Sequence, residues 1–309
     1  MSALQTPTTR AKDLDVLAGP EGTFAIVALD QRNTLRRMFT AIGQDGAAAD
    51  LRAFKHDVVA SLSPSASGFL LDPDFGVPAA VADGAAAESC GILVACEPAE
   101  RQKWNGEPRP GRDPQLNAAW VTGMGGHAVK FFVQMRPDRP RATGEPDLIA
   151  EALDVVREVI ADCRAAGIPS IIENLIYPIP GAEELSAQAK ADAVVEAARL
   201  LNELQPDLLK LEYPGTPEDT RRIADAVSVP WAVLSAGVPF EQFQEVLKIA
   251  CDEGGASGFI GGRAIWREAV GMDPAERQTF LAETGRRRLD ECIAAIDGRA
   301  VPWRSVVGE

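Results

Sequence analysis

Residues 208–214, Leu-Leu-Lys-Leu-Glu-Tyr-Pro, form a short apolar run that contains two charged side chains and ends at a proline. A run of this length and composition is typical of a strand buried on both faces, as in a parallel sheet covered by helices. Seven more runs of this kind occur along the chain: 24–30 (FAIVALD), 68–72 (GFLLD), 91–97 (GILVACE), 128–135 (AVKFFVQM), 169–176 (PSIIENLI), 231–237 (WAVLSAG) and 258–263 (GFIGGR). Together they predict eight parallel strands.

The stretches between these runs carry apolar residues three and four positions apart, which indicates amphipathic helices. The clearest patterns cover residues 51–62, 147–166, 182–204 and 240–253, and a further helix is expected to start at Pro217. Eight strands, each followed by a helical pattern, within about 250 residues predict an α/β fold of the (β/α)8 TIM-barrel type. A doubly wound open sheet is the alternative, but no Gly-x-Gly-x-x-Gly follows the first strand.

No linker, repeat or low-complexity tract divides the chain, so we expect one domain over residues 1–309. The barrel is expected over about residues 22–270, with a C-terminal helical extension over 272–309. Residues 1–20 and this extension are expected to add helices that cover the ends of the barrel.

The chain carries 31 Lys and Arg against 45 Asp and Glu, a net charge of −14. This acidic balance argues against nucleic acid or an anionic membrane surface as partner. It does not exclude a small anionic substrate, because a helix N-terminus and a single arginine can form a local anion site. No apolar run approaches the roughly 18 residues of a membrane span, and the first residues lack the pattern of a secretory signal.

The five cysteines form no Cys-x-x-Cys pair and mostly have apolar neighbours in the sequence. We therefore expect reduced packing residues and a cytoplasmic protein. The chain contains two histidines, His56 and His127, so a zinc site made of three imidazoles from this chain is impossible. A homo-oligomer is expected, because the outer helices of such barrels commonly form interfaces.

Catalytic groups of a TIM barrel come from the C-terminal ends of its strands. Charged residues stand at that end of six predicted strands: Asp30, Arg32, Asp72, Glu97, Lys130, Glu173, Lys210 and Glu212. Strand alternation places Lys210 on the same face as Leu208 and Glu212, and we infer that this face points into the barrel. Buried ion pairs rarely add stability over apolar residues, so a cluster of this size favours catalysis over a structural network.

Lys210 has leucines on both sides, in a run predicted to be buried. Desolvation lowers the pKa of a lysine, and a neutral amine can form a Schiff base with a ketone. For Lys210 alone, a side chain that extends from the strand end into solvent is the alternative. The second lysine, Lys130, and the glutamates on neighbouring strands favour the nucleophile.

Glycine turns follow the seventh and eighth predicted strands, at Ser235-Ala236-Gly237 and Gly261-Gly262-Arg263. TIM barrels commonly bind phosphate at this position, on backbone N–H groups. The Arg263 guanidinium suits a pair of phosphate or sulfonate oxygens. The two turns therefore predict an anion site.

The chain resembles the class I aldolases of the tagatose-1,6-bisphosphate aldolase type and, within that group, the sulfofructose-phosphate aldolases. The resemblance covers nearly the whole chain and is carried by residues 24–32, 62–76, 128–131, 170–173, 208–212 and 230–266. The turn at Asp72-Pro73-Asp74 is more similar to the tagatose branch, and residues 256–266 are more similar to the sulfosugar branch.

The resemblance implies roles for individual residues. Lys210 forms the Schiff base, Glu173 transfers protons and Lys130 lies beside the iminium. Asp30 and Gln31 hold substrate hydroxyls, and Glu212 also contacts the substrate. The phosphate is held by Ser235, Gly237, Gly262 and Arg263 of the two glycine turns, and Ala236 is a further substrate-binding candidate there. Arg32 is a candidate for binding the distal anionic group.

The hypothesis that follows is a metal-independent aldehyde-lyase without a cofactor. Neutral Lys210 attacks C2 of a ketose 1-phosphate, with Lys130 keeping it deprotonated through like-charge proximity. Glu173 donates a proton as the carbinolamine loses water. Either Glu173 or a water held by Asp30 takes the C4 hydroxyl proton. Substrates are 6-deoxy-6-sulfofructose 1-phosphate or tagatose 1,6-bisphosphate, which give dihydroxyacetone phosphate and sulfolactaldehyde or glyceraldehyde 3-phosphate.

Two rivals follow from the same sequence. A metal-dependent aldolase on this fold is disfavoured by the shortage of histidine. A barrel that binds a sugar phosphate as a sensor is disfavoured because such a protein has no need of a desolvated lysine beside carboxylates.

Overall fold

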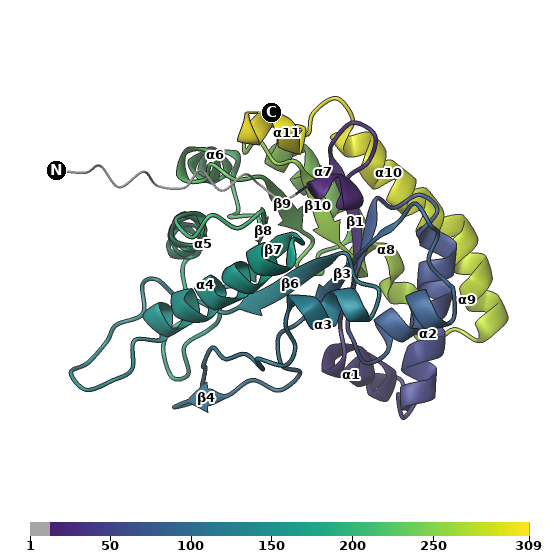
Figure 1. The fold of residues 1–309 in the computed structure, drawn as a ribbon, viewed down its shortest axis with the longest axis horizontal. Coiled ribbons are helices and arrows are strands. Elements are labelled where there is room, and N and C mark those ends of the chain that lie inside the picture. Colours follow the sequence, from purple (N-terminus) through teal and green to yellow (C-terminus); the bar gives the residue numbers. More distant parts are fainter. Residues whose placement is uncertain (1–12, 309) are drawn as a thin grey trace.

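The computed structural model describes residues 13–308. Its strands form a closed parallel barrel in the order β1-β2-β3-β6-β7-β8-β9-β10, with β10 paired to β1 (Figure 1). The strands are β1 (Phe24–Leu29), β2 (Gly68–Leu71), β3 (Gly91–Ala95), β6 (Ala128–Val133), β7 (Ser170–Asn174), β8 (Leu208–Leu211), β9 (Trp231–Leu234) and β10 (Gly258–Gly261). The predicted barrel is confirmed. Each strand ends one to three residues before its apolar run does, because the last residues of each run leave the sheet at the barrel mouth. Lys130, Glu173 and Lys210 still lie within their strands.

Helices surround the barrel in the predicted alternation. They are α1 (Asn33–Ala41), α2 (Ala48–Leu62), α3 (Ala118–Gly123), α4 (Leu148–Ala166), α5 (Ala187–Asn202), α6 (Pro217–Ala226), α7 (Phe240–Asp252) and α8 (Arg263–Trp266). The helix expected from residue 182 begins at Ala187, because the Ser186 side chain accepts a hydrogen bond from the Ala189 amide and caps it. A π-helical segment, Pro78–Ala82, takes the place of a full helix after β2.

A small hairpin, β4 (Lys103–Trp104) and β5 (Glu107–Pro108), lies between β3 and α3 and was not predicted. Its turn is Asn105-Gly106, with φ of 49° and 86°. An Asn-Gly pair is the strongest short-range hairpin signal, so this sequence contained the information. Glu107 anchors the hairpin, since its carboxylate accepts hydrogen bonds from Arg139 at 2.8 Å and from the Tyr177 hydroxyl at 2.8 Å.

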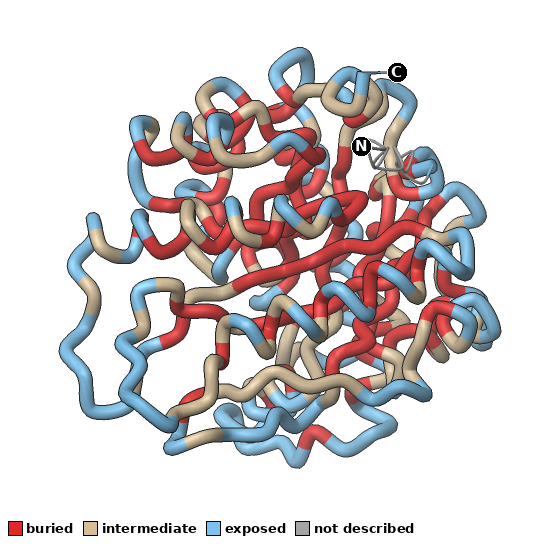
Figure 2. The backbone as a smooth tube through the Cα atoms, turned by 60° about the vertical axis from the view of Figure 1, so that its left-hand side comes forward, coloured by how far each residue is buried: buried red, intermediate tan, exposed pale blue. Residues whose placement is uncertain are grey.

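The strands form the buried centre of the molecule, and the exposed segments are mainly loops and outer helix faces (Figure 2). Side chains that point into the barrel form an apolar cluster over most of its height: Phe24, Ile26, Ala28, Leu70, Leu93, Ala95, Ala128, Ile171, Leu208, Ala232 and Ile260. Leu14, Leu17 and Trp303 belong to the same cluster and close the amino end of the barrel. The interior is therefore packed from that end and leaves the opposite end for the charged groups.

The C-terminal extension has two parts. The short helix α11 (Trp303–Val307) covers the amino end of the barrel with the 3-10 helix Leu14–Leu17, as expected. The longer part, α9 (Pro274–Phe280), a π-helical turn (Leu281–Gly285) and α10 (Arg286–Ile296), packs beside α2 and α7 (Figure 1). The expectation that it covers a barrel end is wrong, because its apolar face completes the outer helical layer. The part of the predicted N-terminal helices in residues 1–12 lies outside the described residues.

All five cysteines are free and buried. Within residues 13–308, no helix combines the length and the apolar character required to cross a membrane.

Candidate active site

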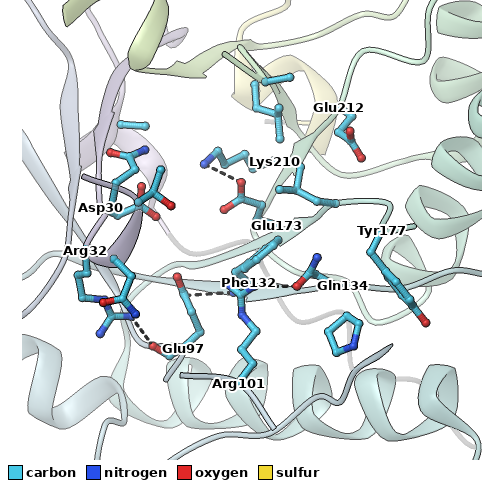
Figure 3. A pocket seen from close by; sticks show the side chains of 18 of the residues that line it. Asp30, Arg32, Glu97, Arg101, Phe132, Gln134, Glu173, Tyr177, Lys210 and Glu212 are labelled. Carbon is cyan, nitrogen blue, oxygen red and sulfur yellow. Dashed lines mark hydrogen bonds and ion pairs between the residues drawn. The ribbon is translucent and has the colours of Figure 1, made fainter. Parts of the chain in front are cut away.

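A pocket of about 1040 Å³ opens at the carboxyl ends of the barrel strands (Figure 3). Eight cationic and five acidic side chains line it: Arg32, Arg37, Arg101, Lys103, Lys130, Lys190, Lys210, Arg263, Asp30, Glu97, Glu100, Glu173 and Glu212. The pocket therefore has an excess of positive charge in a chain whose net charge is −14. This favours an anionic small molecule as its ligand.

Lys210 lies inside the barrel at the base of this pocket, as predicted. It is 5% exposed, and its Nζ is 2.9 Å from Oε1 of Glu173 (Figure 3). The two residues face each other because β7 and β8 are paired with Glu173 opposite Lys210. A buried amine thus has a proton acceptor within hydrogen-bond distance.

Lys130 occupies the centre of a carboxylate cluster. Its Nζ is 2.7 Å from Oε2 of Glu173, 2.8 Å from Oδ2 of Asp30 and 2.9 Å from Oε1 of Glu97. Burial would lower the pKa of Lys130, but the three carboxylates outweigh it and raise this pKa well above the ordinary value. Glu173 lies between the two amines, with one oxygen on each, so the two lysines that the sequence placed side by side are bridged by a carboxylate.

The carboxylates respond to the same neighbours. Burial alone would raise the pKa of Asp30 and of Glu173, but the charges of Lys130 and Lys210 outweigh it and lower both pKa values. Both groups are therefore ionised near neutral pH. Glu97 joins them because β3 is paired with β6, which brings Ala95 opposite Lys130. The sequence placed Glu97 at the end of the predicted strand before that of Lys130, but the prediction gave Glu97 no part in the site.

The predicted anion-binding residues gather at one side of the pocket. Ser235, Ala236, Gly262 and Arg263 line it, whereas Gly237 lies against Arg263, whose Cζ would be 3.0 Å from a Cβ at that position. A Cβ at Gly262 would lie 1.9 Å from the carbonyl oxygen of Ala28, so no side chain fits there. Arg263 forms no ion pair with an acidic side chain of residues 13–308. It is therefore available for an anionic ligand.

A model of the DeoC/LacD family of aldolases matches residues 24–268 of this chain. The chain belongs to this aldolase family. The prediction of an aldolase is thereby confirmed.

Relatives agree with this assignment, and solved structures share the fold. The tagatose 1,6-diphosphate aldolase 2 of Enterococcus faecalis is 28% identical over 95% of both chains. The fructose-bisphosphate aldolase of Plasmodium falciparum has a TM-score of 0.71 at 15% identity, with 93% of each chain covered. An archaeal fructose-1,6-bisphosphate aldolase, solved with its catalytic lysine covalently bound to the carbinolamine intermediate, has a TM-score of 0.60 at 15% identity, covering 90% of this chain and 97% of its own.

Gln31 and Arg32, which come directly after Asp30, also line the pocket, and both were predicted to bind the substrate. The side-chain oxygen of Gln31 is buried and has no hydrogen-bond partner among residues 13–308, so it can accept a hydrogen bond from a ligand. Arg32 donates from Nη2 to the carbonyl oxygen of Glu97 at 2.8 Å and lies 3.4 Å from Asp74. The first strand thus supplies an acid, an amide and a guanidinium to the same pocket.

Glu212 directly follows β8, two residues beyond Lys210, and lines the same pocket. It accepts a hydrogen bond from the Ile176 amide at 2.7 Å and is 3.4 Å from Lys190 of α5. Burial raises the pKa of Glu212 above its ordinary value, although both contacts oppose this. Lys190 was not predicted, because nothing in the pattern of α5 distinguishes it from a solvated helical lysine.

Arg101 and Lys103, on the segment that leads into the hairpin, also line the pocket and were not predicted. The Arg101 guanidinium lies 4.1 Å from the centre of the Phe132 ring, and Nη1 donates to Gln134 at 2.7 Å (Figure 3). It forms no ion pair with an acidic side chain within the described part of the chain. Its remaining N–H groups can therefore bind an anion.

Metal ligands do not cluster in this pocket. Among residues 13–308, no group of three or more His, Cys, Asp or Glu side chains is arranged to hold a metal ion.

Proposed function

We propose that this protein is a class I aldolase that cleaves a ketose 1-phosphate through a Schiff base on Lys210. The contact that carries the proposal is the 2.9 Å pair between the Lys210 amine and the Glu173 carboxylate, buried at the base of a cationic pocket. Family membership and the names of the relatives support it. Tagatose 1,6-bisphosphate is the substrate that the relatives' names favour, and 6-deoxy-6-sulfofructose 1-phosphate has the same two anionic ends.

The first step needs a neutral amine. Glu173 is ionised and its Oε1 contacts Nζ of Lys210, so it is the base that takes a proton from this amine while its second oxygen stays bound to Lys130. Lys210 then attacks C2 of the ketose, and a carbinolamine forms. The proton held by Glu173 passes to the C2 hydroxyl, which leaves as water and produces the iminium.

Cleavage uses the same carboxylate again. Glu173, ionised once more, takes the proton of the C4 hydroxyl as the C3–C4 bond breaks and its electron pair enters the enamine. The aldehyde leaves first, and Glu173 returns the proton to C3. Water then hydrolyses the iminium and releases dihydroxyacetone phosphate. Asp30 and Gln31 hold substrate hydroxyls in this arrangement, and Lys130 keeps Asp30 and Glu173 in place.

The two ends of the substrate are assigned to two groups of cations. The C1 phosphate is placed at Ser235, Gly262 and Arg263, where the chain offers a glycine turn and an unpaired guanidinium. The distal anion is placed at Arg32 and Arg101 on the opposite loops. A guanidinium fork binds either a phosphate or a sulfonate oxygen pair.

The test is a retro-aldol screen that measures dihydroxyacetone phosphate. The substrates are tagatose 1,6-bisphosphate, fructose 1,6-bisphosphate, 6-deoxy-6-sulfofructose 1-phosphate and a ketose 1-phosphate with a neutral C6. We expect cleavage of a substrate with two anionic ends, with tagatose 1,6-bisphosphate preferred, and no loss of rate in excess EDTA. Release of no product from any of them, or full inhibition by EDTA, would contradict the proposal.

Two variants test which arginine binds the C1 phosphate and which binds the distal anionic group of the substrate. Arg263→Leu is expected to raise KM for every ketose 1-phosphate. Arg101→Leu is expected to raise KM only for substrates with an anionic C6, by about 10-fold or more, as for loss of a charge-assisted contact. Equal effects of Arg101→Leu on the neutral and the anionic substrate would remove Arg101 from the distal site.

A further inference from the structure

A second lysine–carboxylate pair lies behind the pocket wall. Lys55 of α2 is fully buried, at 0% exposure, and does not line the pocket. Its Nζ donates to the carbonyl oxygen of Leu29 at 2.7 Å and to that of Gln31 at 2.9 Å, and it forms an ion pair with Asp72. The two carbonyl groups stand on either side of Asp30. One ammonium group therefore holds the main chain before and after a residue of the pocket.

Asp72, also at 0% exposure, organises the turn after β2. Its carboxylate accepts hydrogen bonds from the amides of Asp74, Phe75 and Gly76 at 3.1, 2.9 and 3.2 Å. A Cβ at Gly76 would lie 3.0 Å from the Asp72 Oδ1 atom, so glycine permits this close approach. The Asp-Pro-Asp-Phe-Gly stretch is thus a turn built around the carboxylate that faces Lys55.

Stability alone is a weak reason for this pair. Burial lowers the pKa of Lys55, and the attraction of Asp72 only partly offsets that effect. Apolar residues of similar volume are often as stabilising as a buried ion pair. What the pair does that an apolar pair cannot is to bind the carbonyl groups of Leu29 and Gln31.

We propose that Lys55 and Asp72 position Asp30 and Gln31 for the reaction. With the main chain held on both sides, the Asp30 carboxylate reaches Lys130 at 2.8 Å, and Gln31 keeps its unpartnered side-chain oxygen buried at the pocket. Neither Lys55 nor Asp72 touches the substrate, so both are positioning residues. The inference rests on the proposed function, in which Asp30 and Gln31 hold the substrate hydroxyls.

The Lys55–Asp72 pair is expected to affect cleavage of the C3–C4 bond more than formation of the iminium. Formation of the iminium depends on Lys210 and Glu173, which come from β8 and β7. Breaking the C3–C4 bond also requires that the hydroxyl groups of the substrate are held by the residues that follow β1. Loss of the Lys55–Asp72 pair therefore slows cleavage of the ketose far more than condensation of dihydroxyacetone phosphate with Lys210.

The test uses the double variant Lys55→Met with Asp72→Asn. Asparagine keeps an acceptor for the amides of residues 74–76, and no unpaired charge is left in the core. We expect release of dihydroxyacetone phosphate from the ketose bisphosphate to fall about 10- to 100-fold, as for a small misplacement of a reacting group. Borohydride trapping of dihydroxyacetone phosphate on Lys210 should stay within about threefold of wild type, because imine formation does not need the misplaced groups.

A matched control lies on the same helix. Asp57 of α2 forms a partly buried ion pair with Arg277 of α9 at 2.6 Å, and neither residue lines the pocket. The double variant Asp57→Asn with Arg277→Met should change the midpoint of urea unfolding and leave both the cleavage rate and the trapping rate unchanged. Asp72→Asn alone is the second test variant, with the same split between cleavage and trapping expected at smaller size.

Different results would overturn the positioning role of Lys55 and Asp72 and the proposed function of the protein. A Lys55–Asp72 variant that cleaves at the wild-type rate, or that loses cleavage and trapping in equal proportion, would overturn the positioning role. So would an equal loss in the Asp57–Arg277 control, because any ion pair of α2 would then have the same effect. Failure of the wild-type protein to release dihydroxyacetone phosphate from any ketose would instead overturn the proposed function.

Discussion

The two ends of the barrel interior are built from the same strands, but one end is apolar and packed and the other is charged and opens into a pocket. On three neighbouring strands the change occurs between consecutive inward positions: Ala128 and Lys130 in β6, Ile171 and Glu173 in β7, Leu208 and Lys210 in β8. The apolar layer gains stability from burial. The charged layer, two residues further along each strand, gains little from its ion pairs and supplies the chemistry. On each of these strands, the residue that packs the core and the residue assigned to catalysis are therefore only two positions apart.

The largest expected effect follows removal of the nucleophile in the charged layer. Lys210→Met should lower the rate of ketose cleavage on the order of 10⁴-fold or more, as loss of a covalent nucleophile does elsewhere. The urea midpoint should not fall, because Glu173 keeps its contact with Lys130 at 2.7 Å. Lys248→Met, at an exposed ion pair of α7, is the control and should change neither quantity. Substantial residual cleavage in Lys210→Met would contradict the role of Lys210 as the nucleophile.

Glu173→Gln is the next largest change, because it removes the proposed proton carrier and keeps the shape of the side chain. We expect kcat to fall by about 10²–10⁴, the usual contribution of a placed acid–base group. Glu196→Gln, at an exposed pair with Arg199, serves as the control. Cleavage by Glu173→Gln at the wild-type rate would assign proton transfer to another carboxylate, such as Asp30.

The apolar layer should respond in the opposite way. Leu208 is fully buried directly below Lys210, so Leu208→Ala should lower the free energy of unfolding by about 2–5 kcal/mol. Its kcat, measured at a temperature where the variant is folded, should stay within about threefold of wild type, since no charged contact changes. A large loss of kcat without a loss of stability would mean that Leu208 contributes to catalysis and not to packing alone.

The charged layer also predicts how stability depends on pH. The lowered pKa values of Asp30 and Glu173 contribute stability that is present above their unfolded values, about 3.9 and 4.3, and that is lost as pH falls through the folded values. The raised pKa of Lys130 contributes stability that is present below about 10.4 and lost as pH rises through its folded value. Urea unfolding across pH should therefore show a plateau with losses at both extremes. The acid loss should be smaller in Glu173→Gln; an equal loss would contradict this account.

The sequence allowed the apolar layer and most of the charged layer to be predicted, for a reason that these residues make plain. Alternation within one strand is a local property, so it placed Lys210 and Glu173 on inward faces. Arg101 lies on the segment that leads into the unpredicted hairpin. The role of Glu97 comes from its contact with Lys130, to which no local pattern points. Lys55 has the sequence context of a solvated helical lysine, and only the path of β1 beneath α2 makes it a buried donor. Such contacts between distant segments have no local pattern.

Reduction of the working enzyme with borohydride in the presence of dihydroxyacetone phosphate, followed by peptide mass spectrometry, reveals whether Lys210 forms the Schiff base. We expect one covalent triose phosphate per chain, on the peptide that carries Lys210, together with loss of cleavage activity. An enzyme that cleaves its substrate yet yields no adduct, or an adduct on a different lysine, would contradict it.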